Sequence, residues 1–239
     1  MSSDYLIRRS ARATRLRIVV KADRVELVAP VRMPESQIHH FAQIQKNWIH
    51  QAQQRVLARS QKTVAGFAPK EYVDGVCLPF QNEELLLRLC LHKQKRLSIE
   101  GINSTTLLVK LPETLQGEPR QKAIRASLEK WFKQQAQFQV EELVNQHAPR
   151  FNLHPRSIRI KTQKSRWGSC GPQNDINLNW LLMLAPAATL EYVVVHELCH
   201  IRHKNHSAAF WDLVAQHLPD YQQQRQWLKQ HGQRLMQGL

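Results

Sequence analysis

The pentapeptide at residues 196–200, His-Glu-Leu-Cys-His, has the spacing of a metal-binding helix. Residues four apart share one face of an α-helix and lie about 6 Å apart along its axis, so His196 and His200 can bind the same ion. Glu197 projects beside them and can reach a water on that ion without binding the metal itself. The pattern H-E-x-x-H is typical of zinc metalloproteases and predicts a metal-dependent hydrolase.

Two further histidines, His203 and His206, follow the motif, and a catalytic zinc ion usually has three protein ligands. If the helix continued, His203 would lie about 10 Å along the axis from His196. Two nitrogen ligands of one ion lie within about 4 Å of each other, because each bond to the metal is about 2 Å long. His203 is therefore a poor candidate for the third ligand.

His206 can bind the same ion only if the helix ends before it. The Lys-Asn pair at residues 204–205 predicts such an end, since Asn tolerates the left-handed conformation that follows many helices. Ser207 is a good N-cap for a second helix. A turn between the two helices would bring His206 back to the other two histidines, and we expect it to be the third ligand.

The expected cofactor is one zinc ion, because zinc suits imidazole ligands, although another divalent metal such as nickel or manganese can occupy a histidine-rich site. Such an ion lowers the pKa of a water toward neutrality and polarises the bond to be cleaved. Glu197 is expected to take the proton from this water and to pass it to the leaving group. A purely structural metal site would leave Glu197 without a task, so the hydrolase interpretation is preferred.

The elements that must position these side chains indicate an α+β fold. Residues 193–195 and Leu198 are apolar and would pack the motif helix into the core. The pattern predicts, in chain order, a long helix over residues 120–147, strands over residues 157–161 and 176–180, and helices after residue 186, from about residue 207 and over residues 219–236.

The first part of the chain is expected to be rich in short strands, with one helix over residues 35–59. A loop with two prolines and a glycine follows residue 111. We therefore expect a β-rich part over residues 1–116 and a metal-binding hydrolase part over residues 117–239, with one continuous domain as the alternative.

The net charge of +15 favours an anionic partner such as a nucleotide or a nucleic acid. Between Glu142 and Asp175 there is no acidic residue. The same stretch contains six cations: Arg150, Arg156, Arg159, Lys161, Lys164 and Arg166. The alternative interpretation is a solvated basic face. The sequence has no apolar run long enough to span a membrane and no secretory signal at its start, so we expect a cytoplasmic protein without a membrane partner.

The four cysteines form no C-x-x-C pair, so a zinc finger or a redox motif is not indicated. Cys77 and Cys90 are expected to be reduced and buried. Cys199 lies between the two motif histidines and is expected to pack in the core. Cys170 could bind the metal or bridge to Cys199, and both roles are disfavoured.

The sequence around the motif resembles the YgjP-like family of predicted metal-dependent hydrolases, which is related to the WLM and SprT-like zincins. The resemblance rests on five segments: Ser165–Cys170, Ile176–Trp180, Leu184–Pro186, Tyr192–His200 and Asn205–Ser207 with the Phe210–Trp211 pair. It implies a zincin-like core, in which a small sheet packs on the motif helix. It also implies that His196, His200 and His206 are ligands and that Glu197 is the catalytic base.

The resemblance leaves the substrate open. The family is named for its peptidase-like features, and a nucleotide pyrophosphatase activity on nucleoside triphosphates has also been attributed to it. The relation to SprT-like proteins suggests a nucleic-acid-associated zinc protein as a third possibility. Arg166 and Lys164 are the candidates for substrate contact, because guanidinium groups bind phosphate bidentately. The alternative for Arg166 is an ion pair with a structural carboxylate. The sequence does not indicate an oligomeric state.

Overall fold

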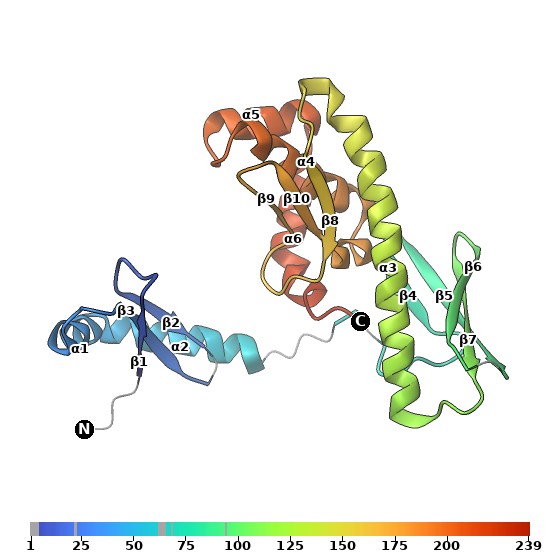
Figure 1. Ribbon diagram of the computed structural model, residues 1–239, viewed down its shortest axis with the longest axis horizontal. Helices are drawn as coiled ribbons and strands as arrows, with labels where there is room; N and C mark the ends of the chain where they lie inside the picture. Colours follow the sequence, from blue (N-terminus) through green and yellow to red (C-terminus); the bar gives the residue numbers. More distant parts are fainter. Residues whose placement is uncertain (1–4, 22, 62–65, 68, 94) are drawn as a thin grey trace. The chain divides into compact units, whose positions relative to one another are not determined.

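The computed structural model describes residues 5–21, 23–61, 66–67, 69–93 and 95–239. The chain divides into two compact units, Met1–Val64 and Ala65–Leu239, which are coloured from blue to cyan and from cyan to red in Figure 1. Each unit has a hydrophobic core of its own. Helices and small sheets occur in both units, so the predicted α+β class is confirmed.

The first unit is a three-stranded sheet with two helices along one face (Figure 1). Its elements are β1 (Leu6–Ser10), β2 (Arg17–Val20), β3 (Val25–Pro30), α1 (Glu35–Ile44) and α2 (Lys46–Gln61). The central strand is β3, which pairs in parallel with β1 and antiparallel with β2. Leu27 and Ala29 of β3 pack against Ile38 and Ala42 of α1 and form the small core.

The helix predicted over residues 35–59 is in fact two helices, α1 and α2, which meet at Gln45. Gln45 has φ −90° and ψ 6°, outside the α-helical region. The apolar pattern could not reveal this break, because Ile38 before it and Ile49 after it are both buried. The periodicity therefore continued through a change in chain direction.

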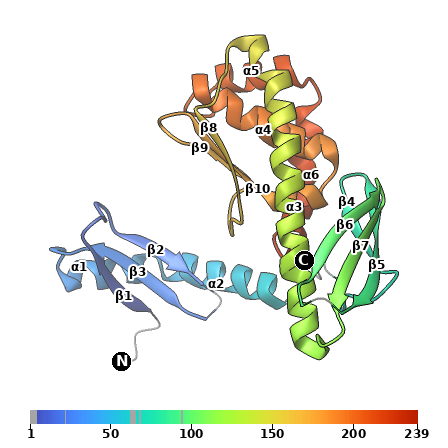
Figure 2. The same cartoon turned by 45° about the vertical axis from the view of Figure 1, so that its right-hand side comes forward.

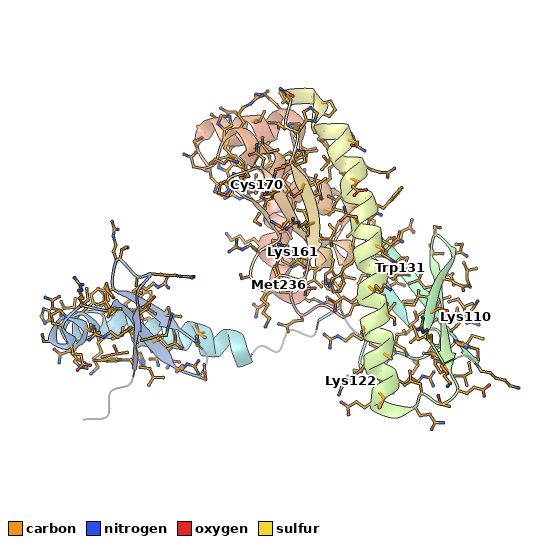
Figure 3. The ribbon with its side chains drawn as sticks, in the orientation of Figure 1. Lys110, Lys122, Trp131, Lys161, Cys170 and Met236 are labelled. Carbon is orange, nitrogen blue, oxygen red and sulfur yellow. The ribbon has the colours of Figure 1, made fainter. Side chains whose placement is uncertain are left out.

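The second unit begins with a four-stranded sheet. Its strands are β4 (Cys77–Phe80), β5 (Glu83–His92), β6 (Ser98–Asn103) and β7 (Thr106–Pro112), in the order β4-β5-β7-β6. One face is apolar and lies toward the long helix α3 (Gly117–His147). Trp131 of α3 reaches Phe80 of β4, with ring centroids 5.6 Å apart (Figure 3).

The helix α3 runs past both sheets of the second unit (Figure 2). Its buried residues recur every four positions: Ile124, Leu128, Phe132, Ala136, Val140 and Val144. Four residues turn an α-helix by about 400°, so the buried stripe rotates by about 40° at each step. This rotation lets one helix pack against the four-stranded sheet with its first half and against the C-terminal region of the unit with its second half.

The C-terminal region of the second unit follows α3. It contains η1 (Pro149–Phe151), β8 (Ser157–Lys161), β9 (Gly168–Cys170), β10 (Asp175–Asn179), η2 (Trp180–Leu184), α4 (Ala187–Arg202), α5 (Ala208–His217) and α6 (Tyr221–Leu235). The strand order is β8-β10-β9, with β9 antiparallel to β10 at one edge. The helix α4 packs on β9 and β10, as expected for a small sheet on the motif helix. The boundary predicted at residues 116–117 falls between β7 and α3, within the second unit, and stays a prediction.

Candidate metal centre

The helix α4 carries the H-E-x-x-H motif through the core of the second unit. Val193, Val194, Val195 and Leu198 are at most 4% exposed, as their apolar character predicts. His196 and His200 remain half-buried on the side of the helix that faces α5. Buried apolar neighbours on the same helix fix the direction in which both histidines project.

The helix ends at Arg202, two residues earlier than predicted, and the chain turns back as expected. His203 is the C-cap with φ −119° and ψ 102°, and Ser207 is at the N-cap position of α5. The turn brings the Nε2 atom of His206 to 3.1 Å from the Nε2 atom of His196. Candidate ligand atoms of these two residues and of His200 all lie within 4.8 Å of one another.

His203 contacts the histidine cluster through its backbone and not through its side chain. Its backbone carbonyl accepts a hydrogen bond from Nδ1 of His200 at 2.9 Å, with Nδ1 assigned as the protonated nitrogen. A histidine that donates from one ring nitrogen to a carbonyl has its other nitrogen free and oriented for a metal. His203 therefore positions His200 through its main chain, and its side chain is not part of the histidine cluster.

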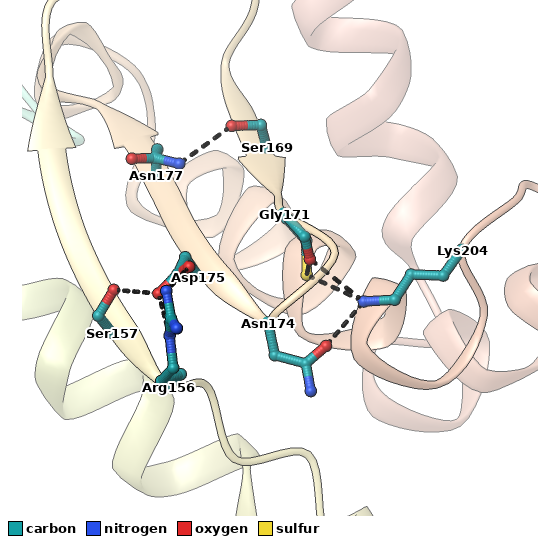
Figure 4. A network of polar contacts seen from close by, with 9 residues as sticks. Arg156, Ser157, Ser169, Gly171, Asn174, Asp175, Asn177 and Lys204 are labelled. Atoms are coloured by element: carbon teal, nitrogen blue, oxygen red, sulfur yellow. Dashed lines mark hydrogen bonds and ion pairs between the residues drawn. The ribbon is translucent and has the colours of Figure 1, made fainter.

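Lys204 holds the turn that carries His206. Its Nζ atom donates to Oδ1 of Asn174 at 2.7 Å and to the carbonyl of Gly171 at 3.3 Å (Figure 4). Both acceptors lie in the turn between β9 and β10. The α4–α5 turn is thus tied to the sheet, and the position of His206 depends on this tie.

Aromatic rings pack around the three histidines. The ring of Phe210 stacks on His200 with centroids 4.5 Å apart, and Phe210 is fully buried. The ring of Trp211 stacks on His206 with centroids 5.5 Å apart and an interplanar angle of 20°. His206 is exposed, and the rings of Phe210, at 4.9 Å between centroids, and Trp211 support it from the side of α5.

The histidine cluster fits a divalent metal ion. Burial, followed by the charges of His200 and His206, lowers the pKa of His196 to about 3, so its ring is neutral, as a metal ligand must be. The Nε2 atoms of His196 and His206 are 3.1 Å apart, within the span of about 4 Å that two ligands of one ion allow. Three neutral imidazoles are also the donor set of catalytic zinc sites.

Glu197 is buried beside the cluster and is only 5% exposed. Burial raises the pKa of its carboxyl to about 7, against the opposing effects of Arg166 and of a hydrogen bond from the backbone of Cys170. A carboxyl with a pKa near neutrality can both accept and donate a proton at physiological pH. Gly168 of β9 lies directly against this side chain, and this contact explains why position 168 is a glycine.

A pocket of about 1380 Å³ opens onto His196, His206 and Glu197. Its lining includes three cations: Arg166 from the loop before β9, and Arg225 and Lys229 from α6. In the part of the chain that the structure describes, none of the three forms an ion pair with a carboxylate, and Glu197 is the one acidic residue of the lining. The pocket is therefore electropositive.

The structure separates the two residues predicted to contact substrate. Arg166 lines the pocket, and among the described residues it has no ion pair with a structural carboxylate, which was the alternative. Lys164 is exposed and does not line the pocket. Sequence reasoning missed Arg225 and Lys229, although their four-residue spacing on a predicted helix places both on one face.

The four cysteines and Glu191 lie outside the histidine cluster. The free thiol of Cys199 is buried, as expected, and that of Cys170 lies 3.8 Å from Nζ of Lys204. Cys77 and Cys90 are free but exposed, so the expectation that they are buried was wrong; both are on strands of the four-stranded sheet, away from its apolar face. Glu191 accepts a hydrogen bond from His147, not from a motif histidine.

Two comparisons bear on the identity of the chain. Comparison with curated proteins finds no match. Comparison with protein families matches residues 14–231 to the model described as YgjP-like, metallopeptidase domain. No helix within the described ranges is long and apolar enough to cross a membrane. Since the family model covers most of both units, and the histidine cluster lies within it, the chain belongs to the YgjP-like family and contains its metallopeptidase domain.

Proposed function

We propose that the protein is a zinc-dependent hydrolase of the metallopeptidase type, with His196, His200 and His206 as the ligands of one ion. A divalent ion bound there supplies a Lewis acid that polarises the scissile group and acidifies water. The observation that carries the proposal is the position of Glu197, whose carboxyl lies in the same pocket as two of the histidines.

Glu197 acts as the general base and then as the general acid. Its pKa of about 7 lets the carboxylate take a proton from water and return it to the leaving group. Arg166 opposes the effect of burial and keeps part of the population ionised. The Cys170 backbone and the contact with Gly168 orient the carboxyl toward the pocket.

A peptide substrate is supported by the strand β9. Within the described residues β10 is the one strand that pairs with β9, so the other edge of β9 has no partner strand, although the backbone of Cys170 donates a hydrogen bond to Glu197; Gly168 of β9 lines the pocket. An extended peptide can add to such an edge through main-chain hydrogen bonds. The scissile bond would then pass over Glu197 and the histidine cluster.

Glu197→Gln tests the chemistry. The amide cannot accept the proton, so hydrolysis of an unfolded protein substrate should fall by about 100-fold or more, while the metal content of the protein stays unchanged. Glu191→Gln, the same substitution on the same helix, is the matched control and should keep its activity. Full activity of Glu197→Gln with metal bound would contradict the proposal.

A nucleoside triphosphate pyrophosphatase that uses the same metal site is the second candidate, and the three unpaired cations of the pocket favour it. A charge-assisted hydrogen bond contributes about 1.5–3 kcal/mol, so Arg225→Ala should raise KM for a triphosphate by about 10- to 100-fold. The experiment measures pyrophosphate release from the four nucleoside triphosphates, with and without a chelator. Release that the chelator abolishes supports this candidate, whereas cleavage of unfolded protein alone supports the first.

The nucleic-acid-associated zinc protein of SprT-like character stays a hypothesis.

A further inference from the structure

The sheet of the first unit has one face away from its helices, and arginines border that face. Leu27 of β3 packs on α1, and neighbours in a strand point to opposite faces, so Glu26 and Val28 point away from the helix. Arg8 of β1 and Arg17 of β2 are the register partners of Val28 on its two sides. Paired residues project to the same face, so both arginines lie on this outer face.

Two more cations, Lys21 and Arg24, join Arg8 around the carboxylate of Glu26. Glu26 accepts hydrogen bonds from Nζ of Lys21 at 2.6 Å and from Nε of Arg24 at 2.8 Å, and Nε of Arg8 lies 3.5 Å away. The first two bonds lower the pKa of Glu26 to about 2, so it is ionised at physiological pH. We call the set of Arg8, Arg17, Lys21 and Arg24 the basic sheet face. Its four positive charges are accompanied by two carboxylates: Glu26, and Asp23, which lies 2.8 Å from Nη1 of Arg24.

The cationic groups of the basic sheet face are accessible. The side chains of Arg8, Lys21 and Arg24 are 53%, 41% and 45% exposed, whereas that of Glu26 is 10% exposed. Glu26 therefore fixes the positions of Arg8 and Lys21, whose outer surfaces remain open to a second anion.

The first unit as a whole is strongly basic. Its 64 residues contain 12 Lys and Arg against four Asp and Glu, a formal charge of +8 out of the +15 of the chain. Arg12 and Arg15 add two exposed cations in the loop between β1 and β2. This charge is outside the metal pocket and is not explained by the proposed hydrolysis.

We propose that the basic sheet face binds the phosphate backbone of a nucleic acid. Guanidinium groups bind phosphate oxygens bidentately, and three of the four cations are arginines. Arg8 and Arg17 are two strands apart, about 10 Å, so they can contact different phosphates of one strand. The face is a short sheet without a protruding helix to enter a groove, so the contacts position a backbone and read no sequence.

A membrane surface fits the face less well. Binding to a bilayer needs an apolar face beside the cations, and within the described residues of this face Leu6 is the one large apolar side chain that is exposed, at 58%. A positively charged surface without an apolar stripe is complementary to a dissolved polyanion and not to a bilayer.

The test measures binding of the full-length protein to fluorescein-labelled 20-nucleotide RNA, single-stranded DNA and duplex DNA, each in two unrelated sequences, over a series of salt concentrations. We expect binding that weakens steeply with salt and differs little between sequences. Arg8→Ala with Arg17→Ala should reduce the slope of log affinity against log salt by about 2, because two phosphate contacts are lost.

Lys93→Ala with Lys95→Ala is the matched control, since it removes the same charge from exposed positions of the second unit. Arg8→Lys with Arg17→Lys keeps the charge and should restore most of the slope, which separates lost contacts from lost folding. An equal loss in the control would overturn the proposal, as would binding to vesicles containing phosphatidylserine but to no nucleic acid. Glu197→Gln should bind as the wild type does, so failure of the hydrolase proposal would leave this result unaffected.

Discussion

Gly168 lies so close to the carboxyl of Glu197 that the structure has no room for a side chain at position 168. A Cβ atom there would lie 2.5 Å from Oε1 and 2.7 Å from Cγ of Glu197. Gly168 belongs to the strand β9 and Glu197 to the buried helix α4, so neither backbone can move away freely. The contact therefore determines where the carboxyl points.

Gly168→Ala should consequently displace Glu197 from the pocket. A shift of about 1 Å in a catalytic group can cost about 100-fold in rate, so we expect a loss of that order in kcat/KM. The metal content should stay unchanged, because the three histidines do not contact position 168. Activity assays together with metal analysis of the purified variant check both expectations.

Gly171→Ala is the control for this prediction. A Cβ at position 171 would lie 3.6 Å from its nearest neighbour, the carbonyl of Asp175, which is an ordinary contact. This variant should keep nearly full activity. If the two alanine variants lost activity equally, the close contact at Gly168 would not be the cause.

The parts of the site that depend on local spacing could be predicted from the sequence. The four-residue interval places His196 and His200 together on any helix, and the helix break that His206 requires is encoded by the few residues before it. The contact between Gly168 and Glu197 could not be predicted, because it depends on how β9 packs against α4. Arg225 was missed for the same reason, since only tertiary packing brings α6 to the pocket.

Replacement of His206 and replacement of His203 should have very different effects on metal affinity. His206→Ala removes a proposed ligand, so metal affinity should fall by more than the 10- to 100-fold that is typical for residues that support ligands. His203→Ala keeps the carbonyl that accepts the hydrogen bond from His200, so its affinity should stay close to that of the wild type. Titration against a chromophoric chelator measures both, and the opposite order would exclude His206 as a ligand.

Trp211 should position His206 without binding the metal. Its ring stacks on that of His206 and on that of Tyr221, the latter with centroids 5.4 Å apart, and the guanidinium of Arg225 lies 4.5 Å from its centroid. Trp211→Ala should lower metal affinity by about 10-fold, and Trp211→Phe should recover part of the loss. Trp48→Ala, at an exposed site of the first unit, is the control, and an equal effect there would argue against a positioning role.

Two buried histidines outside the three-histidine cluster, His147 and His217, lie in the core of the second unit. The Nδ1 atoms of His147 and His217 are 3.3 Å apart, and Nε2 of His147 is 2.9 Å from Oε1 of Glu191. Arg150 donates a hydrogen bond to the backbone carbonyl of His217 at 3.3 Å, and the positive charge of Arg202 acts electrostatically on the His217 ring. Among the described residues the buried Nε2 atom of His217 has no hydrogen-bond partner.

This environment should make folding stability depend on pH. Burial, then His147, Arg150 and Arg202, lower the pKa of His217 from 6.5 to about 4. The unfolded chain binds a proton at this residue below pH 6.5 and the folded chain does not, so stability is complete above pH 6.5 and is lost as the pH falls toward about 4. In His217→Gln, Tm should therefore fall less than in the wild type between about pH 7 and about pH 5. His154→Gln, at an exposed histidine, should keep the wild-type dependence, and identical profiles for all three proteins would show that His217 does not carry this effect.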